Sequence, residues 1–559
     1  MNYIMYSAVS AENISEYLGK PEYSYYFVLK KYIPVFEKLG DVIVVHSFVA
    51  IEEMLAEFDD GEVVVICCAP PNKSYINSRV KVVNIFAWEF DNLPNEVWES
   101  DVRQNWEYVL SQHAGAITLS NYSQQAVFGS LGADYPVAVI PVPIWDDFQS
   151  LYLADANPVK DPVIIEVDGS IVESSSYRRA DDCFDVDPAK VQISRERCPN
   201  QITLDFNVDS PASGYIGGFY EPEEWGAWSK HSSPWILFPY ELVGEFTLTL
   251  KLNAYGNNVG RKITVEIDGQ KKSFVPKSEF DSYDFTFNVS RPALIIRFSA
   301  IDVEAIEGAV DERSMGIGLS SLTVTRGDNI PESSTRRKKA KLTLSGVVYT
   351  TVFNPDDDRK NWQDIVKAFC FAFRDRSDAS LVLKVTHHSL GKFLGRFHYL
   401  LSSLGDFSCN VIVVHGYLDK AEFNKLIQAT SFYINASKCE GLCMPLMEYM
   451  AAGIPAVATN NTAMMDYFND SVGFVVESDK APSIWPHDPR QLYKTIQYRI
   501  DWMSLVKCLE ESYFVATSEL EKYRLFSNAS TEAIRNFASF DVVVTGMSRF
   551  ISSLSSESK

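Results

Sequence analysis

Two glutamates with a defined spacing stand in the C-terminal half of the chain. Glu440 and Glu448 bracket the sequence Gly441-Leu442-Cys443-Met444-Pro445-Leu446-Met447. The apolar run 432–435 before them predicts a strand, and Pro445 suits the first turn of a helix. Both carboxylates and the unpaired N–H groups of a helix start would then lie at the carboxyl edge of a parallel sheet. That edge can bind phosphate oxygens, and a carboxylate can accept from two sugar hydroxyls at once.

Cations precede these acids along the chain. Arg359 and Lys360 follow a predicted strand over 342–353 and stand before a predicted helix over 362–373. Fixed cations at such a strand end would stabilise the negative charge that a leaving diphosphate gains. Lys384 is unusual inside an apolar predicted strand, and it points either toward phosphate or, as a snorkelling side chain, toward solvent.

These stretches carry a family resemblance. The string 440–448, with Ala451-Ala452-Gly453-Ile454-Pro455-Ala456-Val457 behind it, resembles the Glu-x7-Glu motif and trailing Ala-x-Gly-x-Pro-Val segment of retaining GT-B glycosyltransferases of family four. The stretch from Arg359 to Phe369 is similar to the Lys-Gly-x3-Leu-Ile-x-Ala-Phe stretch of that family. The stretch from Phe86 to Pro94 is similar to a bacterial subset that builds surface polysaccharides.

The resemblance implies roles for single residues. Arg359 and Lys360 would neutralise the diphosphate of a nucleotide-sugar donor, Glu440 would hold the sugar hydroxyls, and Glu448 would hold the ribose. The resemblance also implies a retaining front-face attack that needs no enzyme nucleophile, metal or cofactor. The predicted catalytic residues are Glu440, Lys360, Arg359 and Glu89, and the predicted donor-binding residues are Glu448, Gly441, Leu442, Cys443, Lys384 and Asn354.

The implied activity is the transfer of a hexose or deoxyhexose to a saccharide. The bacterial subset implies a lipid-linked glycan acceptor in O-antigen, capsule or exopolysaccharide synthesis. The first half departs from the family pattern, because the expected Gly-Gly loop is missing between Ala8 and Tyr26 and the position of the catalytic His reads Trp88-Glu89. Glu89 and Glu22 are therefore the acceptor-side candidates, and Asn354 stands where many members carry an arginine.

Simpler explanations exist for the same residues. Glu440 and Glu448 could be a loop acid and a helix-start acid, and Arg359-Lys360 could begin a solvated helix. We interpret Asp356-Asp357-Asp358 as acids that cap a helix rather than as a metal motif. His387-His388 lacks a third ligand, which favours a surface loop over a metal site.

The chain must supply elements that position these residues. Short apolar runs alternate with amphipathic stretches over 1–157 and 342–540, which predicts two parallel α/β sheets. Short β-branched and aromatic runs over 158–330 predict an inserted all-β sandwich of the jelly-roll kind. The basic segment 331–341 is predicted to be a linker, and the residues after about 485 are predicted to be helical. Residues 541–559 are predicted to form a tail whose Ser-rich end, 551–559, should fray. The predicted fold class is α/β with GT-B architecture: two Rossmann-like domains, the inserted sandwich, and a C-terminal helix that returns to the first domain.

The predicted insert carries rings next to acids. The stretch 217–229 holds Tyr220, Trp225 and Trp228 beside Glu221, Glu223 and Glu224. Sugar C–H faces pack on rings while acids accept from hydroxyls, so this stretch could contact carbohydrate. Packing in the core of the insert is the simpler explanation.

Composition excludes several other classes of protein. The 559 residues contain 51 Lys+Arg and 73 Asp+Glu, a net charge of −22, which makes nucleic acid an improbable partner. Nine scattered cysteines without a CxxC pair fit reduced thiols. No signal peptide is readable, and no segment reaches the roughly 18 to 20 uncharged apolar residues that span a bilayer. The predicted location is cytoplasmic, and peripheral contact with the inner membrane or with other assembly enzymes is left open.

Three other functions compete with the transferase hypothesis. The first is a non-catalytic glycan-binding or scaffold protein of an assembly machinery. A second is a GT-B epimerase or hydrolase that acts on the nucleotide sugar itself. The third is a glycosidase that uses Glu440 and Glu448 as acid and nucleophile. It is disfavoured because these carboxylates would have to lie about 5 to 10 Å apart across a sugar, and nothing else in the sequence supports a hydrolase.

Overall fold

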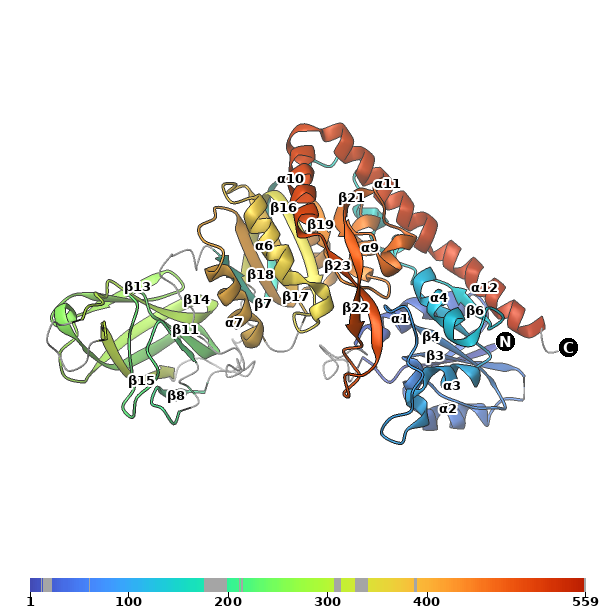
Figure 1. Ribbon diagram of the computed structural model, residues 1–559, viewed down its shortest axis with the longest axis horizontal. Helices are drawn as coiled ribbons and strands as arrows, with labels where there is room; N and C mark the ends of the chain where they lie inside the picture. Colours follow the sequence, from blue (N-terminus) through green and yellow to red (C-terminus); the bar gives the residue numbers. More distant parts are fainter. Residues whose placement is uncertain are drawn as a thin grey trace.

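The computed structural model describes residues 1–11, 13, 23–59, 61–174, 199–210, 212, 215–305, 313–326, 340–386 and 390–556. Figure 1 shows three parts in a row: an α/β domain that holds the N-terminus, a second α/β domain, and an all-β lobe at the far end. The candidate residues named above lie in the two α/β domains.

The first domain is built on a six-stranded parallel sheet in the order β2-β1-β3-β4-β5-β6. Strand β3 (Val63–Cys68), in the middle of this sheet, consists of six buried residues, as expected where helices cover both faces. The strands are β1 (Asn2–Tyr6), β2 (Asp41–Val45), β3 (Val63–Cys68), β4 (Lys81–Phe86), β5 (Gly115–Thr118) and β6 (Val137–Val139). The helices are α1 (Tyr23–Glu37), α2 (Phe48–Leu55), α3 (Trp106–Ser111), α4 (Asn121–Leu131) and α5 (Trp145–Phe148).

The second domain contains six parallel strands in the order β18-β17-β16-β19-β20-β21. The chain proceeds from β16 to one side through β17 and β18, and then returns to the other side of β16 with β19. The strands are β16 (Ala340–Phe353), β17 (Ala379–Val385), β18 (Asn410–Tyr417), β19 (Phe432–Asn435), β20 (Ala456–Thr459) and β21 (Gly473–Val476). The helices are α6 (Trp362–Ala372), α7 (Leu390–Ser402), α8 (Lys420–Gln428), α9 (Met444–Ala451) and α10 (Trp502–Ser518).

Strand β7 (Val159–Glu173) corrects the expected domain boundary at 158. It pairs antiparallel with the first half of β16 and then with β18, so it belongs to the sheet of the second domain. Its alternating side chains bury Ile165 and Val167 against Leu342 and Leu426 in one core. An alternating strand looks the same in sequence whichever sheet it joins, which is why the boundary was misplaced. Of the predicted linker 331–341, residues 331–339 lie outside the described part, and Ala340 and Lys341 begin β16.

Within the region predicted to be an all-β insert, the strands after β7 form one eight-stranded sheet around one core. The two longest strands, β11 (Trp235–Ala254) and β14 (Asp281–Ser299), pair antiparallel and shift register between Leu237 and Gly244. The other strands are β8 (Gln201–Asp205), β9 (Ile216–Gly217), β10 (Ala227–Trp228), β12 (Ile263–Ile267), β13 (Gln270–Phe274) and β15 (Ile317–Arg326). Trp235, Leu237 and Leu294 of this lobe are buried in the core of the second domain rather than in that of the lobe.

The C-terminal helices run back to the first domain, as Figure 1 shows along its upper right edge. Helix α11 (Leu520–Ala538) packs on α9, and α12 (Phe540–Ser556) reaches the first sheet, where Lys81 Nζ donates to the carbonyl of Leu554 at 2.7 Å. The fraying expected over 551–559 is therefore not seen as far as Ser556, where α12 ends. Helix α12 buries apolar residues at helical spacing, including Val543, Met547, Phe550, Ile551 and Leu554.

Between β21 and α10 the chain forms a hairpin that the sequence did not predict. Strands β22 (Ser478–Ile484) and β23 (Lys494–Ile500) pair antiparallel where we expected helix after about 485. We call residues 478–500 the interdomain hairpin, because its contacts join the two α/β domains. Two Rossmann-like domains with a C-terminal helix returning to the first constitute the GT-B architecture, so the predicted fold class is confirmed.

Candidate functional site

The candidate site lies where the sheet of the second domain changes direction. Strands β16 and β19 are neighbours, so the loops that follow them, 354–361 and 436–443, meet at the carboxyl edge of the sheet. In open α/β sheets this switch point is where ligands bind. The backbone N–H of Lys438 donates to the carbonyl of Arg359 at 2.7 Å and joins the two loops directly.

Lys360 and Glu440 form a buried ion pair at this junction. Lys360 Nζ lies 2.7 Å from Oε1 and 2.8 Å from Oε2 of Glu440, whose side chain is only 3% exposed. Ser437 donates its hydroxyl to Oε1 of the same carboxylate at 2.6 Å. Burial would raise the pKa of Glu440, but Lys360, Arg359 and the hydrogen bond from Ser437 outweigh it and lower the pKa to about 2. The carboxylate is therefore ionised at every physiological pH, ready to accept from hydroxyls.

Arg359 connects the two domains. Its Nη1 lies 3.3 Å from Oε1 of Glu89, in the first domain, and 3.5 Å from Oε2 of Glu440, in the second. Its Nε donates to Asp357 at 2.8 Å. Burial raises the pKa of Glu89, and Arg359 opposes that rise. The structure thus brings together all four predicted catalytic residues, with two cations facing three carboxylates.

Backbone strain is concentrated around the pair. Three residues other than glycine have left-handed backbone angles there: Asn361 at φ 52°, Cys443 at φ 63° and Thr462 at φ 47°. A β-branched residue such as Thr462 rarely adopts this conformation, and such strain gathers at functional sites. The hydroxyl of Thr462 accepts from the backbone N–H of Glu440 at 2.9 Å, so the strained turn holds the acid in place.

The loop 440–443 offers backbone donors beside the carboxylate. In the described part of the chain, no hydrogen bond leaves the backbone N–H groups of Gly441, Leu442 and Cys443. The side chains of Leu442 and Cys443 are buried, and Tyr467 donates its hydroxyl to the carbonyl of Leu442 at 2.6 Å. Only the backbone of these two residues can serve a ligand.

Gly441 marks a close approach between the domains. A Cβ atom at this position would lie 3.0 Å from Cβ of Ala87 and 3.2 Å from the backbone nitrogen of Trp88. The loop that carries Glu440 therefore packs directly against the segment that carries Glu89. A glycine is required here by space rather than by its backbone angles.

Glu448 lies apart from the ion pairs, on α9. Among the described residues its carboxylate has no hydrogen bond or ion pair, and burial raises its pKa to about 7 against the field of Lys31 on α1. Lys31 itself is bound to Asp147. Glu448 is thus a carboxyl group without a protein partner on the helix that follows the Glu440 loop.

Two predicted donor-binding residues have structural partners instead. Lys384 is buried and donates to the carbonyls of Gly416 at 2.9 Å and Val385 at 3.4 Å. It shares a face of the sheet with Val382, which belongs to the core under β7 and α8. The side chain of Asn354 accepts from the backbone N–H of Asp356 and shapes the loop 354–361. The prediction that Lys384 points to phosphate finds no support in these contacts.

The three consecutive aspartates pair with cations rather than cap a helix. Asp356 binds Arg396 at 2.7 Å, Asp357 binds Arg359, and Asp358 binds Lys438. No group of three or more possible metal ligands occurs in the described residues, and His387-His388 and Glu22 lie outside them. Sequence reasoning missed Ser437, Asp357 and Thr462 as supports of the site, because small polar residues and loop acids give no signal in one sequence.

The interdomain hairpin holds the Glu89 segment from the other side. Trp485 packs against Trp88, Trp98 and Trp106 of the first domain at ring distances of 5.6, 6.0 and 5.9 Å. Asp91 accepts from the hydroxyl of Thr495 and the backbone N–H of Ile496, both at 2.9 Å. The segment 87–92 is therefore held between the Glu440 loop and the hairpin.

Two family models match parts of the chain. Residues 409–484 match Glycosyl transferases group 1, and residues 197–326, within the all-β lobe, match a domain of unknown function, DUF7024. The first match contains Glu440 and Glu448 and ends before β23. It confirms the glycosyltransferase resemblance for that segment, whereas membership of family four and retention stay predictions.

Relatives and solved structures give further likenesses. A protein of the Sulfolobus islandicus filamentous virus, "Putative glycosyltransferase 48", is 38% identical over 68 residues, which are 12% of this chain and 21% of the viral protein. The chain therefore spans about a fifth of that relative. HepE of Anabaena, in complex with UDP and glucose, is 10% identical at a TM-score of 0.44, with 99% of this chain and 100% of that chain covered. TarM of S. aureus is 6% identical at a TM-score of 0.40, with 90% and 58% covered. In the described residues no helix combines the length and apolar character needed to cross a bilayer.

Proposed function

We propose that this protein is a retaining glycosyltransferase that moves a hexose or deoxyhexose from a nucleotide-diphosphate sugar to a saccharide. The observation that carries the proposal is the Lys360–Glu440 pair at the switch point of the second sheet, inside reach of Arg359. A cation and an acid within one hydrogen-bond length can bind a diphosphate and the hydroxyls of the sugar attached to it. The group 1 match over the Glu440 loop supports the same reaction class.

In this proposal each group has a separate task. Lys360 and Arg359 bind the diphosphate and stabilise the charge that gathers on it as the glycosidic bond breaks. Glu440 accepts from the sugar hydroxyls, and the N–H groups of Gly441 to Cys443 complete the cradle. Glu448 accepts from the ribose hydroxyls, which its lack of a protein partner permits.

Donor binding must change the ion pairs at the site. Two cations now face Glu89, Asp357 and Glu440, so a diphosphate has to displace carboxylates from Arg359. We propose that Glu89 is the acid displaced and that, once released, it faces the acceptor hydroxyl. Its raised pKa suits a group that accepts a proton. The acceptor is proposed to be a lipid-linked glycan of surface-polysaccharide assembly, as the resemblance of 86–94 implies.

The test is donor turnover by the purified full chain. We expect one member of a nucleotide-sugar panel to yield nucleoside diphosphate, and Lys360→Met to lower the rate by about 100-fold or more, the scale of losing a fixed charge stabiliser. Lys367→Met is the matched control, because that lysine lies on α6, is 43% exposed and pairs only with Asp364 among the described residues. Full activity in the Lys360 variant would remove the assignment. Free sugar or an epimer formed without any acceptor would instead identify a hydrolase or epimerase.

A further inference from the structure

An exposed aromatic surface lies on the all-β lobe, far from the ion pairs of Arg359 and Lys360 (Figure 1). Trp225, Trp228, Tyr255 and Phe280, which we call the aromatic platform, contact one another with ring distances of 5.1 Å for Trp225–Trp228, 5.2 Å for Trp225–Phe280 and 5.7 Å for Trp228–Tyr255. All four are at least partly exposed, and Phe280 is 40% exposed. None of them belongs to the core of the lobe or packs against it. The simpler explanation for these rings, packing in the core, therefore fails.

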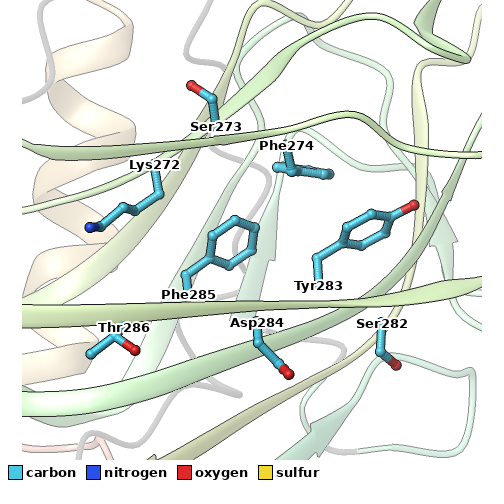
Figure 2. Close-up of a pocket in the computed structure, with 8 residues that line it drawn as sticks. All are labelled: Lys272, Ser273, Phe274, Ser282, Tyr283, Asp284, Phe285 and Thr286. Carbon is cyan, nitrogen blue, oxygen red and sulfur yellow. The ribbon is translucent and has the colours of Figure 1, made fainter.

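Another group of rings in the lobe shows the contrast. Figure 2 shows Phe274, Tyr283 and Phe285 directed into the space between β13 and β14, where they line a concavity of about 580 Å³. Phe274 and Phe285 are members of the core, and Tyr283 packs against it. Folding accounts for those three rings but not for the platform.

The backbone is shaped to present the platform. Glu223 and Gly226 exchange two backbone hydrogen bonds in a tight turn that has Trp225 near its tip, and Gly226 has a φ of 148° that other residues rarely adopt. A Cβ atom on Gly318 would lie 2.9 Å from the ring of Trp225 and 3.0 Å from that of Trp228. The bare backbone of β15 thus lets both indoles lie close to the strand.

Two charged groups at the edge of the platform, Glu223 and Arg313, neutralise each other. Trp225 donates its indole N–H to Glu223 at 2.9 Å, and Arg313 binds the other oxygen of Glu223 at 2.7 Å. Arg313 also lies over the ring of Tyr220, at 5.1 Å from its centre. The Glu223–Arg313 pair offers hydrogen-bond donors and acceptors to the hydroxyl groups of a ligand.

The sheet next to the platform presents a flat polar face. Thr249 on β11 lies between Asp284 on β14 and Thr323 on β15, and the next pairs along the strands bring Thr247, Thr286 and Thr325 to the same face. Threonine hydroxyls therefore lie on one face across three strands, with Lys251 between them and the platform. An extended chain with many hydroxyl groups can bind along such a face.

We infer that the aromatic platform binds a neutral saccharide chain. The apolar C–H face of a pyranose fits flat on exposed rings, its hydroxyls match the Glu223–Arg313 pair, and a longer chain can extend toward the threonines. A bilayer is disfavoured as the occupant because exposed acids, Glu221 and Glu224, flank the rings and the whole chain carries a charge of −22. This assignment stands on residues of the lobe and does not depend on the proposed transferase activity.

The test is glycan binding by the full chain. A printed array of bacterial surface and plant glycans, followed by calorimetric titration of the strongest binder, should give a measurable Kd for the wild type. Trp225→Ala and Phe280→Ala should each weaken that binding about ten-fold or more, since each removes a stacking face. Phe514→Ala is the matched control, because this ring is 54% exposed on α10, outside the lobe.

Further outcomes decide between this site and the others. Lys360→Met should keep the array signal, because the platform is separate from the Lys360–Glu440 site. This holds whatever the substitution does to donor turnover. The assignment is overturned if no arrayed glycan binds the wild type, if both platform variants bind as the wild type does, or if Lys360→Met abolishes binding. It is also overturned if the variants lose binding to anionic phosphatidylglycerol vesicles or to a peptide library rather than to glycan. Phe280→Ala, in a loop before β14, keeps the test open should Trp225→Ala not fold.

Discussion

The guanidinium of Arg359 lies within 3.5 Å of carboxylates from both α/β domains, Glu89 in the first and Glu440 in the second. The ion pairs of this one side chain therefore depend both on the distance between the two domains and on the charge of any ligand between them. Lys360 and Glu440 form a tight pair next to it. The proposed catalytic role of this cluster and its contribution to stability can be measured separately.

The ion pair should contribute to stability as well as to turnover. Lys360→Met leaves Glu440 buried without its main partner, and Glu440→Gln leaves Lys360 likewise, so we expect each to lower the free energy of unfolding by about 1–3 kcal/mol. The double variant should lose less than the sum of the two. Urea unfolding of the four proteins measures this coupling.

Turnover should not follow stability in that series. All three variants should lose donor turnover at temperatures where they remain folded, because neither the charge nor the acid is restored in the double variant. Recovery of activity in the double variant would show that the pair only holds the loops together.

Glu448 should make stability fall as pH rises. Its folded pKa of about 7 is above the ordinary value of 4.5, so the folded state binds a proton that the unfolded state has lost between these two values. Stability should therefore decline between about pH 4.5 and 7, by about 1–2 kcal/mol for this partly exposed group. Glu448→Gln should remove that decline in urea unfolding measured at pH 5, 6, 7 and 8; an unchanged slope in the variant would assign the effect to other groups.

Gly441→Ala should separate the domains without a change of charge. The added methyl group would meet Ala87 and Trp88 across the interface, and the interdomain hairpin holds the segment 87–92 on its other side. We expect a loss of turnover of about ten-fold or more, as small misplacements at reacting groups cause. Gly129→Ala, inside α4 with nothing within 4 Å of the new atom, is the matched control and should stabilise slightly. Equal rates in the two variants would contradict the close approach at Gly441.

The interdomain hairpin should keep the domains closed in the absence of substrate. Asp91→Ala removes the acceptor of two hydrogen bonds from the hairpin, and Trp485→Ala removes a ring packed on three tryptophans. Both variants should show a larger radius of gyration in X-ray scattering and faster proteolysis near 485–493. Phe514→Ala should show neither change. If the scattering curves of the variants superimpose on that of the wild type, contacts other than those of the hairpin hold the two domains together.

Sequence patterns predicted the two α/β domains because buried parallel strands are uninterrupted apolar runs. The family resemblance implied that Lys360 and Glu440 bind one donor, and the structure places them in contact at one sheet edge. Patterns did not assign β7 to a sheet, because alternation is the same in either one. They did not predict the interdomain hairpin either. Its strand 478–484 is mostly polar, and the hairpin packs against the first domain, which the local sequence does not reveal.

The supports of the site were beyond sequence reasoning. Ser437 and Thr462 act through a single hydroxyl each, at positions fixed only by the fold. Lys384 was misjudged because a buried lysine looks the same whether its ammonium meets phosphate or, as here, two backbone carbonyls. The return of a C-terminal helix to the first domain was predicted, but its helical end at 551–556 was not, because the serines there suggested fraying.

The burial of Trp235 in the core of the second domain has a mechanical consequence. The lobe and the second domain share a hydrophobic core, so they should move as one rigid body if the first domain rotates relative to them. A saccharide bound on the aromatic platform would therefore stay at a fixed distance from Glu440 whenever the first domain moves.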